Sequence, residues 1–281
     1  MEEIQQILEL LTLPFMQRAL VGGILTGLLG GLLGGVAILR QLSFFSDALG
    51  HSALLGLVIG LLLGLDPRWV LLPFAVLFGL GVTWLIERVN LASDAVLNIV
   101  YSSSLALAVI GLTFTDAYRG SITQLLFGDI LGISKTDLWL SGGLLGICIL
   151  YLGLTLRSQM LTTLHEPLAR AQGVATRLHR QIFVVLLSLV VAISIQSVGV
   201  LLVSAFIVIP ACTARILSQR FTHYLGLAMG LGGISAVLGM IGSATFNLPS
   251  GPSIVTTQLI FFLLGVISTS MQLDKKTIGW R

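Results

Sequence analysis

Two metal-binding residue types stand four positions apart near the start of an apolar segment. Asp47 and His51 fall between Ser46 and Ser52, and a nearly unbroken apolar run follows from Ala53 to Leu65. Residues at i and i+4 share one face of a helix, so this carboxylate and this imidazole would lie side by side. Both groups bind zinc and manganese. The spacing therefore indicates part of a transition-metal site on an apolar helix.

A purely structural interpretation of the same pair is also consistent with the spacing. Asp47 would then lie near a helix cap, and His51 would hydrogen-bond within the helix bundle. Ionisable groups inside a bilayer are costly, however, and they commonly mark an ion pathway. A bound metal needs about four ligands or more. Symmetric dimerisation would bring two such pairs together and would supply four.

The composition identifies an integral membrane protein. Of the 281 residues, 56% are hydrophobic and 10% are charged, whereas a soluble domain carries roughly 25% charged residues. The mean hydropathy is +1.02. Glycine is frequent, with 32 residues, as is common where transmembrane helices pack closely. Gly23, Gly27, Gly31 and Gly35 recur every four residues and so predict a smooth helix face.

The predicted fold is an all-α polytopic membrane protein with eight or nine transmembrane helices. A bilayer core is crossed by about 20 apolar residues, and the chain offers these spans: 18–39, 46–65, 68–87, 94–115, 137–156, 180–196, 199–217, 222–245 and 254–273. The weakest break is at 196–199, and eight spans remain if it is only a kink. We expect one transmembrane domain over residues 1–281, with residues 1–15 as an interfacial segment.

The distribution of basic residues predicts the orientation. When the loop Arg157–Arg180 is placed in the cytoplasm, a nine-span arrangement leaves four of the 15 basic residues outside. These four are Arg18, Arg68, Arg119 and Lys135. The positive-inside rule therefore favours a cytoplasmic C-terminus and an N-terminus outside the cell.

The predicted cytoplasmic loop carries signals of a short helix over residues 163–176. Pro167 fits the first helical turn behind the acidic Glu166, and Gly173 fits the C-terminal stop. Such a helix between two spans could dock onto a partner protein, although an ordinary solvated connection is the alternative. We expect His165 and His179 to be surface residues rather than metal ligands.

A second candidate segment covers residues 201–215. Pro210 lacks a backbone donor and should kink this span, and Ser204 and Thr213 could hydrogen-bond the carbonyl groups that it frees. A kinked helix of small residues can line a pathway. A simple packing kink is equally consistent with the pattern.

No phosphate-binding loop of the type G-x-x-x-x-G-K-[ST] occurs, and the only lysines are Lys135, Lys275 and Lys276. ATP binding by such a loop is therefore excluded, and we do not expect the chain to be an enzyme by itself. The absence of H-E-x-x-H and C-x-x-C motifs also gives no support to a membrane metalloprotease.

Four segments match one family in order along nearly the whole chain: Leu39–Gly56, Leu126–Leu131, Leu201–Arg215 and Leu248–Val255. Together they resemble the zinc/manganese ABC-transporter permease family. The resemblance implies a channel of two permease copies, two copies of a separate ATPase beneath it, and an extracytoplasmic metal-binding protein. It assigns Asp47 and His51 to the metal pathway. It assigns Glu166, Ala169 and Gly173 to the helix that couples to the ATPase.

The implied function is import of a divalent transition metal across the plasma (inner) membrane of a prokaryote, or a plastid-like equivalent. Zinc is favoured because Leu55 precedes Gly56, where manganese members often have proline, and because the segment Phe127–Asp129 resembles the zinc permeases. Manganese and iron are alternatives, and no permanently bound cofactor is expected. A non-ABC secondary transporter or channel for divalent cations is the alternative class, and a structural membrane scaffold is a third.

Overall fold

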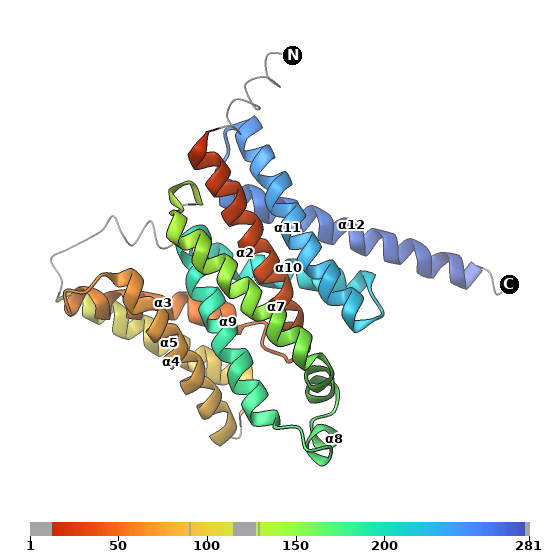
Figure 1. The fold of residues 1–281 in the computed structure, drawn as a ribbon, viewed down its shortest axis with the longest axis horizontal. Helices are drawn as coiled ribbons and strands as arrows, with labels where there is room; N and C mark the ends of the chain where they lie inside the picture. Colours follow the sequence, from red (N-terminus) through yellow and green to blue (C-terminus); the bar gives the residue numbers. More distant parts are fainter. Residues whose placement is uncertain (1–12, 90, 115–127, 129, 279–281) are drawn as a thin grey trace. The chain divides into compact units, whose positions relative to one another are not determined.

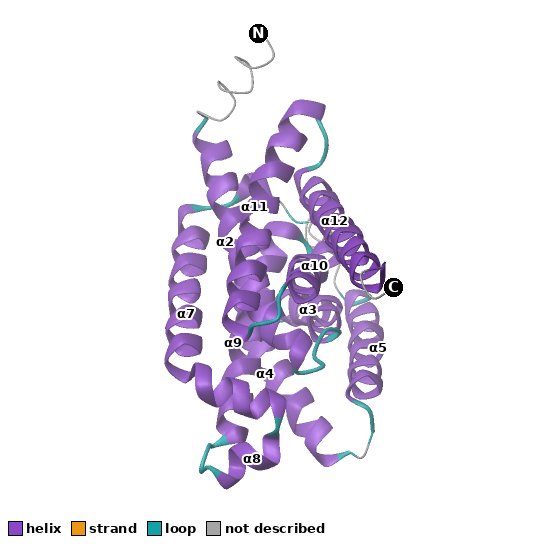
Figure 2. Ribbon diagram, turned by 90° about the vertical axis from the view of Figure 1, so that its right-hand side faces the viewer, coloured by secondary structure: helices purple, strands orange, loops and turns teal. Residues whose placement is uncertain are grey.

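Every regular element that the structure describes is a helix (Figure 1, Figure 2). The computed structural model describes residues 13–89, 91–114, 128 and 130–278. The predicted interfacial segment 1–15 lies almost entirely outside this described part, and so does most of the family-like segment 126–131. The all-α fold class is confirmed.

Each of the nine predicted spans corresponds to a helix. The elements are α2 (Pro14–Leu39), α3 (Phe45–Leu62), α4 (Pro67–Arg88), α5 (Ser93–Leu112), η1 (Ile130–Gly132), α7 (Lys135–Leu164), α8 (Glu166–Ala171), α9 (Thr176–Val198), α10 (Val200–Leu217), α11 (Phe221–Phe246) and α12 (Ser250–Ile278). Among the described residues, eight helices are long and apolar enough to cross a membrane, and α10 is a shorter apolar helix.

The predicted weak break between the sixth and seventh spans is a true helix boundary. α9 ends at Val198 and α10 begins at Val200. Gly199 between them has a φ of 88°, a conformation that glycine adopts at no steric cost because it lacks a Cβ. The backbone therefore separates two helices here, and the prediction of a single kinked helix is excluded.

The chain forms two compact units. The first contains Leu39 onward through α3, α4 and α5, most of α7, then α8, α9 and the start of α10 up to Ser204. The second contains α2 up to Ile38, η1, the rest of α10 from Ala205, α11 and α12. The predicted site residues fall mostly in the first unit.

Glycines allow α2 to pack directly against the backbone of its neighbours in the second unit. A Cβ at Gly31 would overlap the carbonyl group of Ala228 in α11, and a Cβ at Gly34 would overlap that of Ile207 in α10. Within the four-residue series, Gly27 and Gly31 thus lie at close backbone contacts, where a larger side chain would not fit.

In the first unit, α3 packs against α4, α5 and α9. Phe45 at its start is 1% exposed and meets the edge of Phe78 of α4 at a centroid distance of 6.3 Å. Further along, Leu57 and Val58 form an apolar cluster with Ala108 of α5. These contacts on both sides fix the helix that carries Asp47 and His51.

Candidate functional site

A tight turn between α2 and α3 determines where Asp47 lies. Gln41 has a φ of 58°, and the backbone N–H of Phe45 donates to the carbonyl of Leu42 at 3.1 Å. Phe44 is the N-cap and offers no side-chain cap. Asp47 consequently lies in the first turn of α3, where the helix dipole favours a carboxylate.

Asp47 and His51 lie together on one face of α3, as predicted. Nε2 of His51 is 3.8 Å from Oδ1 of Asp47, and their side chains are 24% and 33% exposed. Two ligands bound tetrahedrally at about 2.1 Å from zinc are separated by roughly 3.4 Å. Small side-chain movements would therefore let both atoms contact one ion.

Within the described part of the chain, no further His, Cys, Asp or Glu side chain joins this pair. No group of three or more His, Cys, Asp or Glu side chains gathers there or elsewhere among those residues. One chain thus offers two donors, which can hold an ion only weakly.

Tyr101 of α5 is a site residue that the sequence reasoning missed. Its ring centroid lies 5.2 Å from that of His51, with the planes tilted by 49°, and it meets Phe44 edge-on at 6.5 Å. Tyr101 therefore covers one side of the imidazole and restricts its rotation. No local spacing could reveal this contact, because α4 separates the two helices in sequence.

A polar pair of side chains lies on the same helix, α5. The hydroxyl of Ser102 donates to Oδ1 of Asn98 at 3.1 Å, and both side chains are exposed. Polar side chains within a span rarely face lipid. This face of α5 is consequently suited to a water-filled path or to another protein surface.

The short helix predicted in the loop 163–176 is present as α8. His165 is its N-cap, with Nδ1 accepting from the backbone N–H of Leu168 at 3.2 Å, so His165 has a structural role. Gly173 has a φ of 78°, and its N–H donates to the carbonyl of Arg170 at 3.0 Å. Pro167 and Gly173 therefore mark the start and the stop as expected.

Glu166 joins α8 to α9 through charge, and Arg180 extends this connection to α4. Its two oxygens lie 2.7 Å from Arg170 and 3.0 Å from Arg180 of α9, and Arg180 also lies 3.6 Å from Glu87 of α4. Burial alone would raise the pKa of Glu166. The hydrogen bond from Arg170 and the charges of Arg180 and Arg170 outweigh burial and hold that pKa below its usual value.

The other two predicted coupling residues differ in their surroundings. Ala169 is completely buried, so it anchors α8 to the first unit. Gly173 has open space where a side chain would be, and Leu168 is 46% exposed. One face of α8 is therefore fixed, and another carries an exposed apolar residue.

α10 continues through Pro210 without interruption. The hydroxyl of Thr213 donates to the carbonyl of Ile209 at 2.8 Å, and not to the carbonyl of Phe206, which proline at 210 leaves without its usual donor. Pro210 is buried and Ser204 is half-buried. A pathway role for Ser204 and Pro210 stays a prediction.

His179, expected at the surface, is less exposed than a fully solvated side chain. It is half-buried, and its Nδ1 lies 3.1 Å from the hydroxyl of Tyr151 in α7. The sequence could not reveal this contact, because the partner lies on another helix. His179 is thus part of a polar contact between α7 and α9.

The fold is that of a multi-pass helical membrane protein. The model of the ABC 3 transport family matches residues 12–269, and the chain belongs to this family. The chain is 30% identical over 262 residues to the manganese import system permease protein ScaB of Streptococcus parasanguinis, with 93% of each chain covered. It is 31% identical over 250 residues to the high-affinity zinc uptake system membrane protein ZnuB of Haemophilus influenzae, with 88% of this chain and 95% of the relative covered.

A solved structure gives the same assignment. A chain of PsaBC from Streptococcus pneumoniae, determined in complex with a Fab, matches with a TM-score of 0.81 at 30% identity, covering 93% of this chain and 95% of that one. The resemblance seen in the sequence is confirmed. The protein is a multi-pass permease of the prokaryotic plasma membrane, and in its family the ATPase is a separate subunit.

Proposed function

We propose that the chain is the permease domain of an ATP-driven importer of divalent transition-metal ions. Asp47 and His51 contact the ion in transit. The observation that carries this proposal is the partly exposed carboxylate–imidazole pair, 3.8 Å apart on a helix long enough to cross a membrane. The names of the relatives support a metal substrate, since they include manganese and zinc systems.

Zinc is the proposed ion, and manganese or iron is the alternative. The relatives are divided between zinc and manganese, so the choice rests on the donors. Two Asp–His pairs would supply two nitrogen and two oxygen ligands, which suits tetrahedral zinc. Manganese is better served by sites richer in oxygen.

A second copy of the chain would complete the site. One copy offers two donors, and a two-fold axis would bring an identical pair opposite the first. The exposed Asn98–Ser102 pair on α5 supports a protein or water interface beside Tyr101 rather than lipid. Four ligands supplied by two chains would select the ion and still release it when the chains move apart.

The further partners are a separate ATP-binding cassette ATPase and an extracytoplasmic metal-binding protein. α8 is the proposed ATPase-docking element, with Glu166, Ala169 and Gly173 setting its position and its ends. Its exposed Leu168 offers an apolar contact. The chain carries no phosphate-binding loop of its own, so ATP hydrolysis belongs to the partner.

Uptake by the reconstituted complex tests this proposal. Permease, ATPase and binding protein are placed in proteoliposomes, and zinc and manganese uptake are measured with and without ATP. Asp47→Ala and His51→Ala should each lower uptake about tenfold or more, because a metal ligand is lost. Asp94→Ala is the matched control, since Asp94 lies in the first turn of α5 as Asp47 does in α3.

Two outcomes would contradict the proposal at different points. Normal uptake by both the Asp47 and the His51 variants would remove these residues from the pathway. Uptake by the chain alone without ATP would instead support a secondary transporter or channel. Copurification with the ATPase shows that the variants are assembled.

A further inference from the structure

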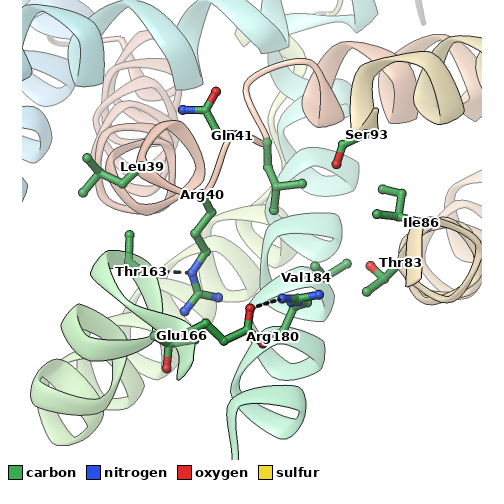
Figure 3. A pocket seen from close by; sticks show the side chains of 12 residues that line it. Leu39, Arg40, Gln41, Thr83, Ile86, Ser93, Thr163, Glu166, Arg180 and Val184 are labelled. Carbon is green, nitrogen blue, oxygen red and sulfur yellow. Dashed lines mark hydrogen bonds and ion pairs between the residues drawn. The ribbon is translucent and has the colours of Figure 1, made fainter. Parts of the chain in front are cut away.

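Arg40 lies in the turn between α2 and α3, beside a cavity of about 320 Å³. Figure 3 shows Arg40, Glu166 and Arg180 extending toward one another from separate elements that surround this cavity. The cavity is also lined by Thr162 and Thr163 at the end of α7. Charged groups from the α2–α3 turn, α8 and α9 thus meet in one place.

The guanidinium of Arg40 joins the turn to two helices. Nε donates to the hydroxyl of Thr163 at 3.4 Å, and Nη2 donates to the amide oxygen of Gln159. The guanidinium carbon also lies 4.7 Å from the centre of the Phe183 ring in α9. One side chain therefore connects the α2–α3 turn with both α7 and α9.

Gln159 extends this connection inside the helix bundle. Gln159 is completely buried, and its Nε2 donates to the hydroxyl of Tyr151 at 2.9 Å. That hydroxyl lies 3.1 Å from Nδ1 of His179. The Arg40 side chain is thus the outer end of a polar chain that runs between α7 and α9.

A simple structural anchor would not need the charge that Arg40 brings. Its Nη1 is buried without a hydrogen-bond partner among the described residues, and burial lowers the pKa of Arg40 to about 10. Uncompensated buried charge is costly. Glu166 attracts Arg40 electrostatically but binds Arg170 and Arg180 instead. Because Nη1 has no partner in the described part of the chain and the cavity offers space, the Arg40 guanidinium can change its hydrogen bonds when α8 moves.

Along the chain, Arg40 lies shortly before the helix that carries the proposed metal-binding pair. Arg40 precedes Gln41, whose positive φ fixes the turn, and α3 begins at Phe45. Asp47 lies in the first turn of α3. A pull on Arg40 that reaches its backbone would therefore act on the end of α3 that carries Asp47.

We propose that Arg40 is a positioning residue that transmits movement of α7 and α8 to the first turn of α3, and so to Asp47. This inference rests on the proposed role of α8 as the ATPase-docking helix. α7 runs unbroken to Leu164, and α8 starts two residues later at Glu166. A movement of α8 caused by the ATPase would therefore displace Thr163 and Gln159, the two residues that hydrogen-bond Arg40.

The test measures zinc uptake and ATP hydrolysis together in proteoliposomes that hold permease, ATPase and binding protein. Arg40→Gln should leave ATP hydrolysis within about twofold of the parent and lower the ions transported per ATP by roughly tenfold, the range of a broken coupling contact. The number of ions transported per ATP by Arg40→Lys should lie between the values for the parent and for Arg40→Gln. Arg88→Gln is the matched control, because Arg88 is an exposed arginine that stacks on Trp84 at 5.5 Å.

A parallel loss of hydrolysis and uptake in the Arg40 variants would show a structural role and overturn the inference. Unchanged ions per ATP would overturn it as well. If Arg40→Gln does not assemble, Tyr151→Phe provides the second variant, since it removes only the hydroxyl beyond Gln159. It should lower the ratio by a smaller factor, and an unchanged ratio in both Tyr151→Phe and Arg40→Lys would refute the inference. Absence of ATP-driven uptake by the parent complex would refute the proposed function itself.

Discussion

At the scale of single residues, the candidate metal site depends on the orientation of one imidazole. Asp47 is held by its place in the first turn of α3, and His51 follows one turn later. The ring of Tyr101 lies against His51 at 5.2 Å and limits the rotamers that the imidazole can adopt. A ligand held in one rotamer binds with less loss of side-chain freedom.

This contact predicts a difference between two substitutions of Tyr101. Tyr101→Leu removes the ring and should raise the zinc concentration for half-maximal uptake several-fold, about 1 kcal/mol for an aromatic contact. The maximal rate of ATP hydrolysis should stay near that of the parent. Tyr101→Phe keeps the ring and should resemble the parent. Equal defects in both variants would show that the hydroxyl is what matters, contrary to ring positioning.

At the scale of elements, the chain uses two kinds of packing. α2 uses glycine to bring helix backbones together, so its position tolerates no side chain at Gly31 or Gly34. α8 is instead held by one buried alanine and by the ion pairs of Glu166. The first arrangement is rigid, whereas ion pairs that are only partly buried contribute little and can exchange. This contrast fits a fixed α2 and a movable α8.

The glycine packing predicts a large effect from one methyl group. Gly31→Ala should destabilise the detergent-solubilised protein by about 1–3 kcal/mol, because the new Cβ overlaps a backbone carbonyl that cannot rotate away. Thermal unfolding measures this change. Gly146→Ala is the control, since a Cβ at Gly146 in α7 meets nothing within 4 Å. If both variants unfold alike, close approach of α2 and α11 is not what requires glycine.

At the scale of the whole molecule, the proposed function requires partners, because the proposed metal pair is half of a site and the sequence has no phosphate-binding loop. Among the described residues only two donors meet at the candidate metal position. Under the proposed function, the permease would therefore work only when assembled with a second copy and with an ATPase. This dependence agrees with membership of the ABC 3 transport family.

The half-site predicts a stoichiometry. At saturation the assembled permease should bind one zinc ion for every two chains at this position, and His51→Ala should abolish that binding. Calorimetry gives the number of zinc ions bound per chain. The molecular mass of the protein in the complex, after subtraction of the detergent, gives the number of chains. One ion per monomeric chain would contradict a site shared between copies.

The sequence by itself determined the features that depend on local order along the chain. Apolar length set the helices, since backbone groups in a bilayer must be satisfied within the segment. Four-residue spacing placed Asp47 beside His51 and gave α2 its glycine face, and Pro167 and Gly173 bounded α8. These results follow from helical periodicity alone.

Only the tertiary structure decided which helices meet. It placed Tyr101 against His51, Arg40 against Gln159, and His179 against Tyr151. The partners in each pair lie on elements far apart in the sequence. Membrane helices share nearly the same apolar composition, so hydrophobicity does not distinguish their neighbours. The choice depends on the shapes of small-residue faces and on a few interhelical hydrogen bonds, which form only when the helices are packed.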